Sequence, residues 1–332
     1  MHLPQLRLRK GPSVKDNYGR VIDYMRLSVT DRCNLSCDYC SAGKSVSDTK
    51  TLPADDILAI ASAASKTGIT KFKLTGGEPL VREDLPQIIK GIKSLPGVKS
   101  VTLTTNGVLL GGRCSELKDA GIDLINVSID TCDKDEYQSV TGSDMLGKVI
   151  DGISTCIRNG IKVRINAVNR GSKTDAVSLA RFADSLGVDL RFIELMPVGK
   201  AREMKGTLNI DIIKVLENEF GKASQTDDKG NGPARYFTFE RLKIKVGFIS
   251  ALGEGFCGEC NRLRVTSDGK LKPCLCFGDF IDLNDALGLE GHKREEELMK
   301  LIGKAVRSKP EKHSFNDPQS VTEMRGMDYI GG

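Results

Sequence analysis

The run Cys33-Asn-Leu-Ser-Cys37-Asp-Tyr-Cys40 decides how the rest of this sequence is interpreted. It follows directly after a β-rich run, Met25–Thr30, and places three thiols within one short loop. Three thiolates are one short of completing a four-iron cluster or a structural zinc site. The spacing therefore predicts a metal centre with one coordination position left for another ligand. Zinc is the less favoured alternative, because none of the histidines in the chain lies near this loop.

A second set of three cysteines lies toward the other end of the chain, as Cys257-Gly-Glu-Cys260 followed by Cys274. Two incomplete sets suggest that one enzyme holds two ligands on two metal centres. Cys276 ranks second to Cys274 as the third ligand. The cysteines without ligand spacing are expected to be small core residues: Cys114, Cys132 and Cys156.

The composition is that of a globular protein with one large domain or a barrel-sized domain plus a smaller one, at 332 residues, 39% apolar and 28% charged. A net charge of +5 does not by itself indicate nucleic acid as a partner. No apolar run approaches the roughly 18–20 residues that cross a bilayer, and the basic N-terminus lacks the apolar part of a signal peptide. We therefore expect a cytoplasmic protein without membrane contact, whose ten cysteines are reduced thiols or metal ligands.

From Met25 to Met196 short β-rich runs alternate with longer helical ones, which predicts parallel strands with right-handed crossovers. Six such units predict an α/β fold with an open, partial (β/α)6 TIM-like barrel, and ligand groups at the C-terminal ends of its strands. The expected strands are Met25–Thr30, Lys71–Thr75, Ser100–Thr104, Leu124–Ser128, Lys162–Ala167 and Leu190–Met196. The expected helices are Asp55–Thr67, Leu85–Ser94, Cys114–Ala120, Leu146–Asn159 and Asp175–Leu186.

The pattern changes after Pro197, where β-like runs at Arg235–Glu240, Lys243–Ser250 and Arg262–Thr266 follow a helix around Ile212–Phe220. These runs predict a smaller, largely antiparallel α+β cap that carries the second cysteine set. The expected division is a basic, flexible arm over residues 1–20, the barrel core over 21–197, and the C-terminal cap over 198–332 with a Gly331-Gly332 tail.

The first cysteine set, with Tyr39 before its third cysteine and Gly76-Gly77-Glu78-Pro79 after the next strand, resembles the radical S-adenosylmethionine (SAM) superfamily. This resemblance implies that the amine and carboxylate of SAM occupy the open iron of a 4Fe–4S cluster. It also implies that electron transfer to the sulfonium releases a 5′-deoxyadenosyl radical.

The second set, with Asn261-Arg262-Leu263-Arg264 inside it, resembles a narrower family, the MoaA-type GTP 3′,8-cyclases of molybdenum cofactor biosynthesis. The similarity extends from about Arg20 to Gly332. It implies that GTP, held at a second 4Fe–4S cluster, becomes (8S)-3′,8-cyclo-7,8-dihydroguanosine 5′-triphosphate in the first step of molybdopterin formation. Rigid holding suits a reaction that joins two carbons of one molecule.

The resemblance implies roles for particular residues. Lys73 stands where the family usually has arginine, and Arg164 where it usually has lysine, so charge carries over but bidentate geometry does not. The expected catalytic residues are Cys33, Cys37 and Cys40, which ligate the first cluster, together with Gly331 and Gly332; Cys257, Cys260 and Cys274 ligate the second. The expected SAM contacts are Tyr39, Gly77, Ser128, Arg191 and Met196. The expected GTP contacts are Arg26, Lys71, Lys73, Thr104, Arg164, Arg262, Leu263 and Arg264.

The family also implies an electron donor such as flavodoxin or ferredoxin and a downstream cyclic pyranopterin monophosphate synthase, and it allows a homodimer. Two alternatives remain open. A peptide-modifying radical SAM maturase with an auxiliary cluster usually has more cysteines in its C-terminal part than the four here. A non-catalytic iron–sulfur carrier or zinc-stabilised module would leave the Gly76-Gly77-Glu78 loop unexplained.

Overall fold

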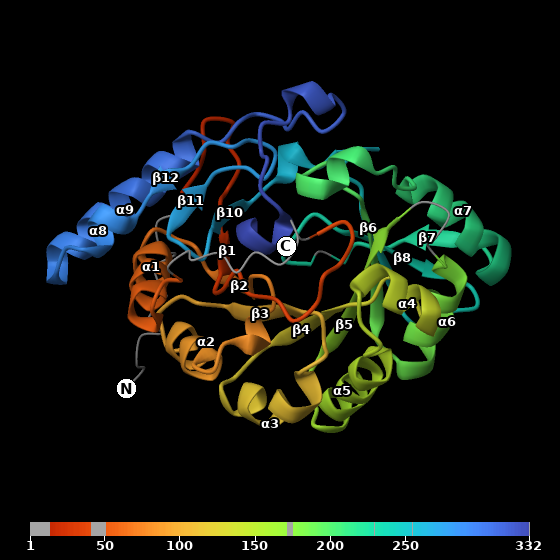
Figure 1. Cartoon of the computed structure of the whole chain (residues 1–332). Helices are drawn as coiled ribbons and strands as arrows, with labels where there is room; N and C mark the ends of the chain where they lie inside the picture. The colour runs from red at the N-terminus through yellow and green to blue at the C-terminus, as the bar shows by residue number, and fades with distance from the viewer. Residues whose placement is uncertain (1–13, 41–50, 171–174, 229, 254, 332) are drawn as a thin grey trace, which may run out of the picture.

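One open sheet organises the molecule (Figure 1). The structure is a computed structural model and describes residues 14–40, 51–170, 175–228, 230–253 and 255–331. Within these residues twelve strands follow one another in the order β12-β11-β10-β1-β2-β3-β4-β5-β6-β9-β8-β7. No helix in these same ranges is long and apolar enough to cross a membrane.

The middle of the sheet is the predicted run of six parallel strands, which confirms the partial-barrel core. Its helices cover the convex outer face, as Figure 1 shows. The strands are β1 (Tyr24–Ser28), β2 (Lys71–Thr75), β3 (Ser100–Thr105), β4 (Leu124–Ser128), β5 (Val163–Asn169) and β6 (Asp189–Glu194). The predicted helices are present as α1 (Ala54–Lys66), α2 (Leu85–Lys93), α3 (Leu110–Asp119), α5 (Leu146–Arg158) and α6 (Ala176–Leu186), and a helix that was not predicted, α4 (Lys134–Thr141), follows β4.

The C-terminal strands extend both edges of this core sheet. β10 (Arg262–Val265) pairs in parallel with β1, and β9 (Val246–Ile249) pairs in parallel with β6. The remaining pairs are antiparallel, as expected, and involve β7 (Ala223–Gln225), β8 (Arg235–Phe239), β11 (Lys270–Lys272) and β12 (Ile281–Asp282). The C-terminal strands thus continue the core sheet on both sides, and no break in the sheet coincides with residue 197.

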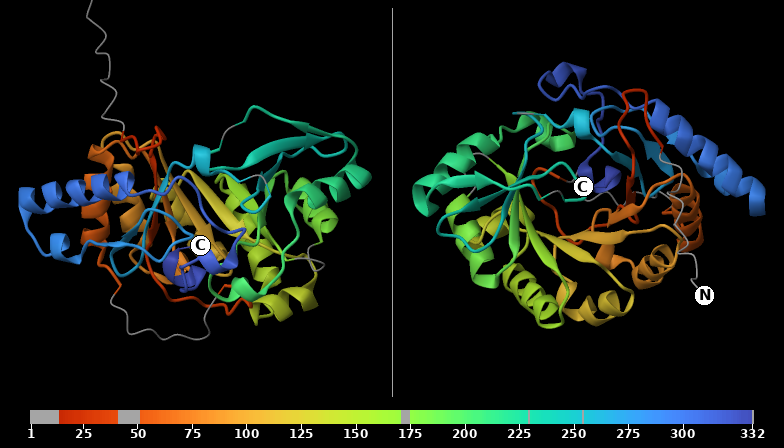
Figure 2. Two further views of the ribbon diagram at one scale, coloured as in Figure 1. Left: turned by 90° about the horizontal axis from the view of Figure 1, so that it is seen from above. Right: turned by 180° about the vertical axis from the view of Figure 1, so that it is seen from behind.

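Three of the C-terminal helices, α7 to α9, lie beside the two extended edges, whereas α10 lies beside the C mark near the centre of the molecule (Figure 2). Helix α9 packs on α1, which joins the C-terminal segment to the start of the barrel. The helices are α7 (Asn209–Phe220), α8 (Asn284–Leu287), α9 (Gly291–Arg307) and α10 (Met327–Ile330). The 3-10 turns are η1 (Pro79–Val81), η3 (Gly199–Glu203), η4 (Cys257–Glu259) and η5 (Pro318–Ser320).

Side-chain alternation along the strands separates an apolar outer layer from a polar interior. Met25 and Leu27 on β1 are buried in the main hydrophobic core, while Arg26 between them points to the opposite face. The register aligns Arg26 with Lys73 on one side and with Arg264 on the other. The same pairing that builds the sheet therefore gathers cations inside the barrel.

The described part of the expected N-terminal arm, residues 14–20, forms a turn closed by a bridge between Lys15 and Val21. Arg20 is buried, pairs with Asp16, and donates from Nη1 to the carbonyl oxygens of Cys257 (2.8 Å) and Glu311 (2.9 Å). This turn ties the start of the chain to the second cysteine set. Residues 1–13 of the expected arm lie outside the described residues.

Candidate active site

The loop of the first cysteine set is held by the backbone that follows β2. The amide of Gly77 donates to Thr30 O (2.9 Å), and the amide of Glu78 donates to Arg32 O (2.8 Å). A Cβ on Gly77 would lie 2.5 Å from Arg32 O, so only glycine permits this approach. A side chain at position 77 would therefore point into the cysteine loop. This contact requires glycine here, independently of the expected SAM contact.

Glu78 joins the ends of β2 and β3 beneath that loop. Its fully buried carboxylate accepts from the Leu80 amide, the Thr105 hydroxyl (2.7 Å) and the Asn106 amide (2.6 Å). Burial raises the pKa of the Glu78 carboxyl to about 7, although these three donors oppose the shift. The carboxylate thereby orients the segment that reaches the first cysteine.

Asn106 is a residue of this site to which sequence reasoning gave no role. Its Nδ2 donates to Asn34 Oδ1 (2.7 Å) and lies 3.8 Å from Cys33 Sγ, which also accepts from the Leu35 amide (3.4 Å). Hydrogen bonds to cysteine sulfur tune the potential of an iron–sulfur cluster. The available signal was its place directly after the strand end at Thr105.

The donor chemistry of Cys33, Cys37 and Cys40 fits an iron–sulfur cluster. All three are free thiols on one loop, and thiolates are the ligands that such clusters take. Burial, with Asp130 and Cys33 nearby, raises the pKa of Cys37 to about 12, so a cation is needed to hold these sulfurs as thiolates. In the described residues no three such side chains converge on a point that a single ion could occupy. The fit therefore rests on the donors and their shared loop.

Two expected SAM contacts, Tyr39 and Ser128, line a small cavity of about 30 Å³ together with Cys37. The Tyr39 hydroxyl is hydrogen-bonded to Asp130, and the Arg170 guanidinium lies 5.6 Å from the centre of its ring. Two more of the five expected SAM contacts lie elsewhere: Arg191 lines the basic cavity described next, and Met196 lines the pocket of the second cysteine set.

A basic cavity of about 240 Å³ fills part of the barrel interior. None of the described residues that line it is acidic, although Arg164 reaches Asp189 at 3.5 Å. Burial lowers the pKa of Lys73 well below its usual value, and the neighbouring arginines add to the shift. The cations that line the cavity are Arg26, Lys73, Arg164, Arg191 and Arg262. Like charges gathered in this way favour a polyanionic ligand such as a triphosphate.

Three of the expected GTP contacts are not among the residues that line the basic cavity. Thr104 Oγ1 is buried and has no hydrogen-bond partner in the described structure, which leaves it available to a ligand. Lys71 forms an ion pair with Asp23 (2.9 Å) and does not line the cavity. Leu263 is fully buried in the hydrophobic core, so its side chain faces away from the cavity.

The second cysteine set surrounds an apolar-walled pocket of about 50 Å³ that shares Arg262 with the basic cavity. Arg264 and Met196 also line this pocket, together with Cys257, Cys260 and Cys274. Cys276 is fully buried in a hydrophobic cluster, and its sulfur accepts from the Ser314 amide (3.3 Å). Three free thiols around one pocket fit the donor set of a second cluster.

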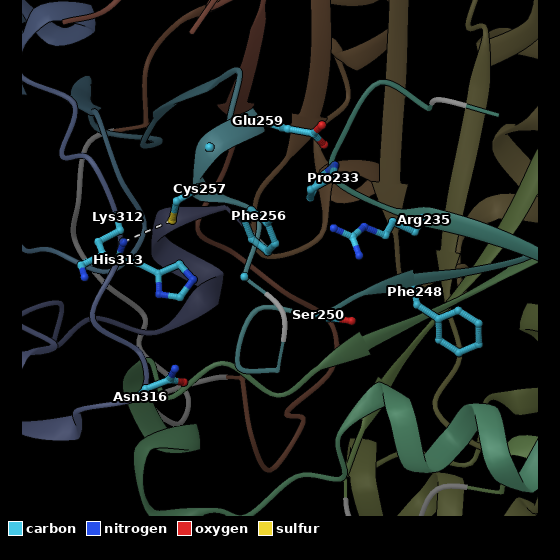
Figure 3. Close-up of a pocket in the computed structure, with 12 residues that line it drawn as sticks. Pro233, Arg235, Phe248, Ser250, Phe256, Cys257, Glu259, Lys312, His313 and Asn316 are labelled. Carbon is cyan, nitrogen blue, oxygen red and sulfur yellow. Dashed lines mark hydrogen bonds between the residues drawn. The ribbon is translucent and has the colours of Figure 1, made fainter. Parts of the chain in front are cut away.

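The second set differs from the first in its charge environment. Lys309 Nζ lies 3.7 Å from Cys260 Sγ, and Arg262 Nη2 lies 3.8 Å from it. Burial acts to raise the pKa of Cys260, but the two cations outweigh it and lower that pKa to about 6. Cys257 accepts from the His313 amide (3.2 Å) and borders a wider outer cavity of about 470 Å³ between β8, β9 and residues 312–316 (Figure 3).

The C-terminal tail reaches the barrel interior through α10, the blue helix beside the C mark near the centre of the view in Figure 1. Gly331 is buried, and its carbonyl oxygen accepts from Arg264 Nη1 (2.6 Å). A Cβ on Gly331 would lie 2.5 Å from Thr75 Oγ1, at the end of β2. The tail therefore approaches the strand ends that carry the first cysteine loop. The other expected tail residue, Gly332, lies outside the described residues.

Known proteins match both halves of the chain. Residues 27–180 match the Radical SAM superfamily, and residues 188–315 match Molybdenum Cofactor Synthesis C. The chain is 40% identical to a GTP 3′,8-cyclase of Clostridium perfringens (strain 13 / Type A), across 96% of this chain and 100% of the relative. It is 37% identical to a GTP 3′,8-cyclase of Alkaliphilus oremlandii across the same shares of the two chains.

Solved structures share the fold at low sequence identity. Streptococcus suis SuiB bound to S-adenosylmethionine superposes with a TM-score of 0.67 at 15% identity, over 95% of this chain and 78% of SuiB. The protein anSMEcpe with bound AdoMet superposes with a TM-score of 0.55 at 17% identity, over 90% of each chain. The radical SAM fold that the sequence predicts is thereby confirmed.

Proposed function

This chain belongs to the GTP 3′,8-cyclases, radical SAM enzymes of molybdenum cofactor biosynthesis, and we propose that the two cysteine sets and the basic cavity between them carry out that reaction on GTP. The product is (8S)-3′,8-cyclo-7,8-dihydroguanosine 5′-triphosphate. The observation that supports this assignment best is the buried group of cations, because it shares Arg262 with the pocket of the second cysteine set.

We assign the triphosphate to the basic cavity, where Arg26, Lys73, Arg164 and Arg191 would bind its oxygens. Arg262 lines both spaces, so the guanine would lie toward Cys257, Cys260 and Cys274. Thr104, whose buried hydroxyl has no partner in the described structure, would orient the nucleotide from β3. Clamping the molecule at both ends restricts the ribose and the base to the geometry in which they react.

We assign SAM to the side of the barrel that carries Cys33, Cys37 and Cys40. When bound there, a 4Fe–4S cluster supplies the electron that cleaves SAM. Tyr39, Ser128 and the loop held by Gly77 would position the cofactor, and Asn106 would donate toward Cys33. Gly331, buried between Arg264 and the end of β2, would exclude water from the reacting atoms, with Gly332 beyond it.

The family relationship extends the proposal to partners. The proposal includes a second 4Fe–4S cluster, reduction by a flavodoxin or ferredoxin, and delivery of the product to a cyclic pyranopterin monophosphate synthase. It also includes a homodimer and a cytoplasmic location. The homologues show an enzyme, so the non-catalytic carrier is not retained. No observation on the site favours the maturase alternative.

The test uses anaerobically reconstituted protein and measures iron, 5′-deoxyadenosine and cyclised product. We expect about eight irons per chain, two cubanes' worth, and 5′-deoxyadenosine only when GTP is present. Cys33→Ser should abolish SAM cleavage, whereas Cys274→Ser should mainly abolish conversion of GTP. Cys132→Ala, at a cysteine outside both sets, is the control and should retain both activities. Equal 5′-deoxyadenosine with and without GTP would refute the assignment.

A further inference from the structure

A buried ion pair outside the proposed site joins strand β11 to the C-terminal tail. Lys272 Nζ contacts Glu323 Oε2, and the two side chains are 0% and 1% exposed. Lys272 is the last residue of β11, and Glu323 lies between η5 and α10. Neither side chain lines the basic cavity or the pocket of the second cysteine set. The proposed chemistry gives the pair no role.

The pair is fully connected by hydrogen bonds. Glu323 Oε1 accepts from both the amide and the Nε of Arg325, each at 2.9 Å, and Lys272 Nζ also donates to Phe277 O (2.7 Å). A buried ion pair of this kind adds little stability over apolar side chains of the same volume, because desolvation offsets the attraction. Its directional bonds instead select one arrangement of the segments that carry the two charges.

Those segments are both parts of the proposed site. Lys272 lies opposite Arg264 in the register of β10 and β11, and Arg264 donates to Gly331 O (2.6 Å). The hydrogen bond from Lys272 Nζ to Phe277 O closes the loop that holds Cys274. Lys272 is therefore held beside β10, the strand that meets the tail, and next to the loop that carries Cys274 of the second set.

The other side of the pair directs the tail toward that strand. Arg325 lies 4.8 Å from the ring centre of Tyr329, and the Tyr329 hydroxyl donates to Asp268 Oδ2 (2.6 Å) in the turn between β10 and β11. Helix α10, which contains Tyr329, leads directly to Gly331. The contacts from Glu323 onward thus form a continuous path along the β10–β11 hairpin to Arg264.

We propose that Lys272 and Glu323 are positioning residues that fix the path of the C-terminal tail, so that Gly331 meets Arg264 beside the substrate cavity. The effect on turnover rests on the proposed function. The effect on the tail does not, because it concerns only the placement of residues 323–331. The two are separated by measuring the tail directly in the absence of GTP.

The experiment is hydrogen exchange by mass spectrometry on the reconstituted full chain, with Glu323→Gln as the variant. This change keeps the shape of the side chain and removes the charge that Lys272 and Arg325 share. Exchange in peptides covering residues 326–331 should accelerate about tenfold or more, since the tail then opens without global unfolding. Iron content and exchange in β1–β6 should stay unchanged, and cyclised product per 5′-deoxyadenosine should fall. Glu311→Gln, at an exposed glutamate before the tail, is the matched control.

A second variant keeps the test valid if Glu323→Gln fails to fold. Lys272→Met combined with Glu323→Leu replaces the pair with apolar side chains, which should preserve stability but not the bonds to Phe277 and Arg325. Fast tail exchange with an unchanged melting temperature supports positioning. Tail exchange equal to that of the unsubstituted chain, in either variant, overturns the proposal. If the unsubstituted chain shows no GTP-dependent 5′-deoxyadenosine, the proposed function fails while the exchange result stands.

Discussion

Replacing Gly77 by alanine tests whether the first cysteine loop depends on the close contact with the backbone after β2. The backbone φ of Gly77 is not positive, so alanine could adopt its conformation. The obstacle is contact alone: the new Cβ would lie 2.5 Å from Arg32 O and 2.6 Å from Asp31 O. These atoms are backbone, so they cannot rotate away as the end of a side chain would.

The expected cost follows from what must move. Relieving the clash separates two loops that are joined by the Gly77 to Thr30 bond (2.9 Å) and the Glu78 to Arg32 bond (2.8 Å). Losing both bonds costs about 1 kcal/mol each, and overpacking adds about 1–3 kcal/mol, for a total of about 3–5 kcal/mol in the free energy of unfolding. The displaced loop carries Cys33, so the first cluster should also fail to assemble.

Urea unfolding of the metal-free protein measures the first effect, and iron content after anaerobic reconstitution measures the second. The Gly77→Ala chain should bind about four irons instead of about eight. Gly112→Ala is the control: this glycine lies inside α3 with no atom within 4 Å of an added Cβ. That change should stabilise the protein by about 0.5–1 kcal/mol. A Gly77→Ala protein within about 0.5 kcal/mol of the unsubstituted chain, with full iron content, would refute the reasoning.

Two further predictions concern titration in the metal-free protein. Burial raises the folded pKa of Glu78 from 4.5 to about 7, so the folded chain holds a proton that the unfolded chain releases. Stability relative to Glu78→Gln should therefore fall by up to about 3 kcal/mol as pH rises from 4.5 to 7, measured by urea unfolding across that range. Lys309→Met removes one of the cations that hold the pKa of Cys260 at about 6. The midpoint of the pH dependence of Cys260 alkylation should therefore rise by about 1–2 units, measured by mass spectrometry.

Each titration has its own control. The Glu78 prediction is contradicted if the difference in unfolding free energy between the unsubstituted chain and Glu78→Gln does not change with pH. For Cys260, Lys304→Met changes an exposed lysine of α9 and should leave the alkylation midpoint in place. A midpoint that is equally unmoved in Lys309→Met would contradict the prediction.

Much of the barrel could be predicted from the sequence because its signals are local. The alternation of β-rich and helical runs predicted six strands, and the structure contains each of them within a few residues. Helix α4 was missed: its short, polar sequence has only a weak apolar stripe, and its start is marked mainly by the Asp133 cap, which accepts from the Glu136 amide. The first cysteine set could be recognised for the same reason, because Cys33, Cys37 and Cys40 lie in one short loop.

Side-chain roles were harder to predict than strands. The cations Arg26, Lys73 and Arg164 could be named as ligand contacts, but only the register shows that they share one cavity with Arg191. Lys71, two residues before Lys73 on the same strand, pairs with Asp23 instead. Asn106 was marked only by its place after a strand end, and Lys309 by no motif; the nearness of both to cysteine sulfurs depends on loops that are distant in sequence.

The sequence by itself determined the family, with the iron–sulfur cluster and SAM that the family implies, because the family is encoded in cysteine spacing and short motifs whose residues act together locally. Only the tertiary structure decided where the C-terminal strands go. β10 joins β1, and β9 joins β6, so the second cysteine set is attached to the edge of the barrel rather than to a separate sheet. The physical reason is that a strand's periodicity defines its two faces but not its partner. Partner choice depends on packing between residues far apart in the chain, as in the pairing of Tyr24 with Arg262. The same long-range packing buries Lys272 against Glu323 and brings Gly331 to Arg264.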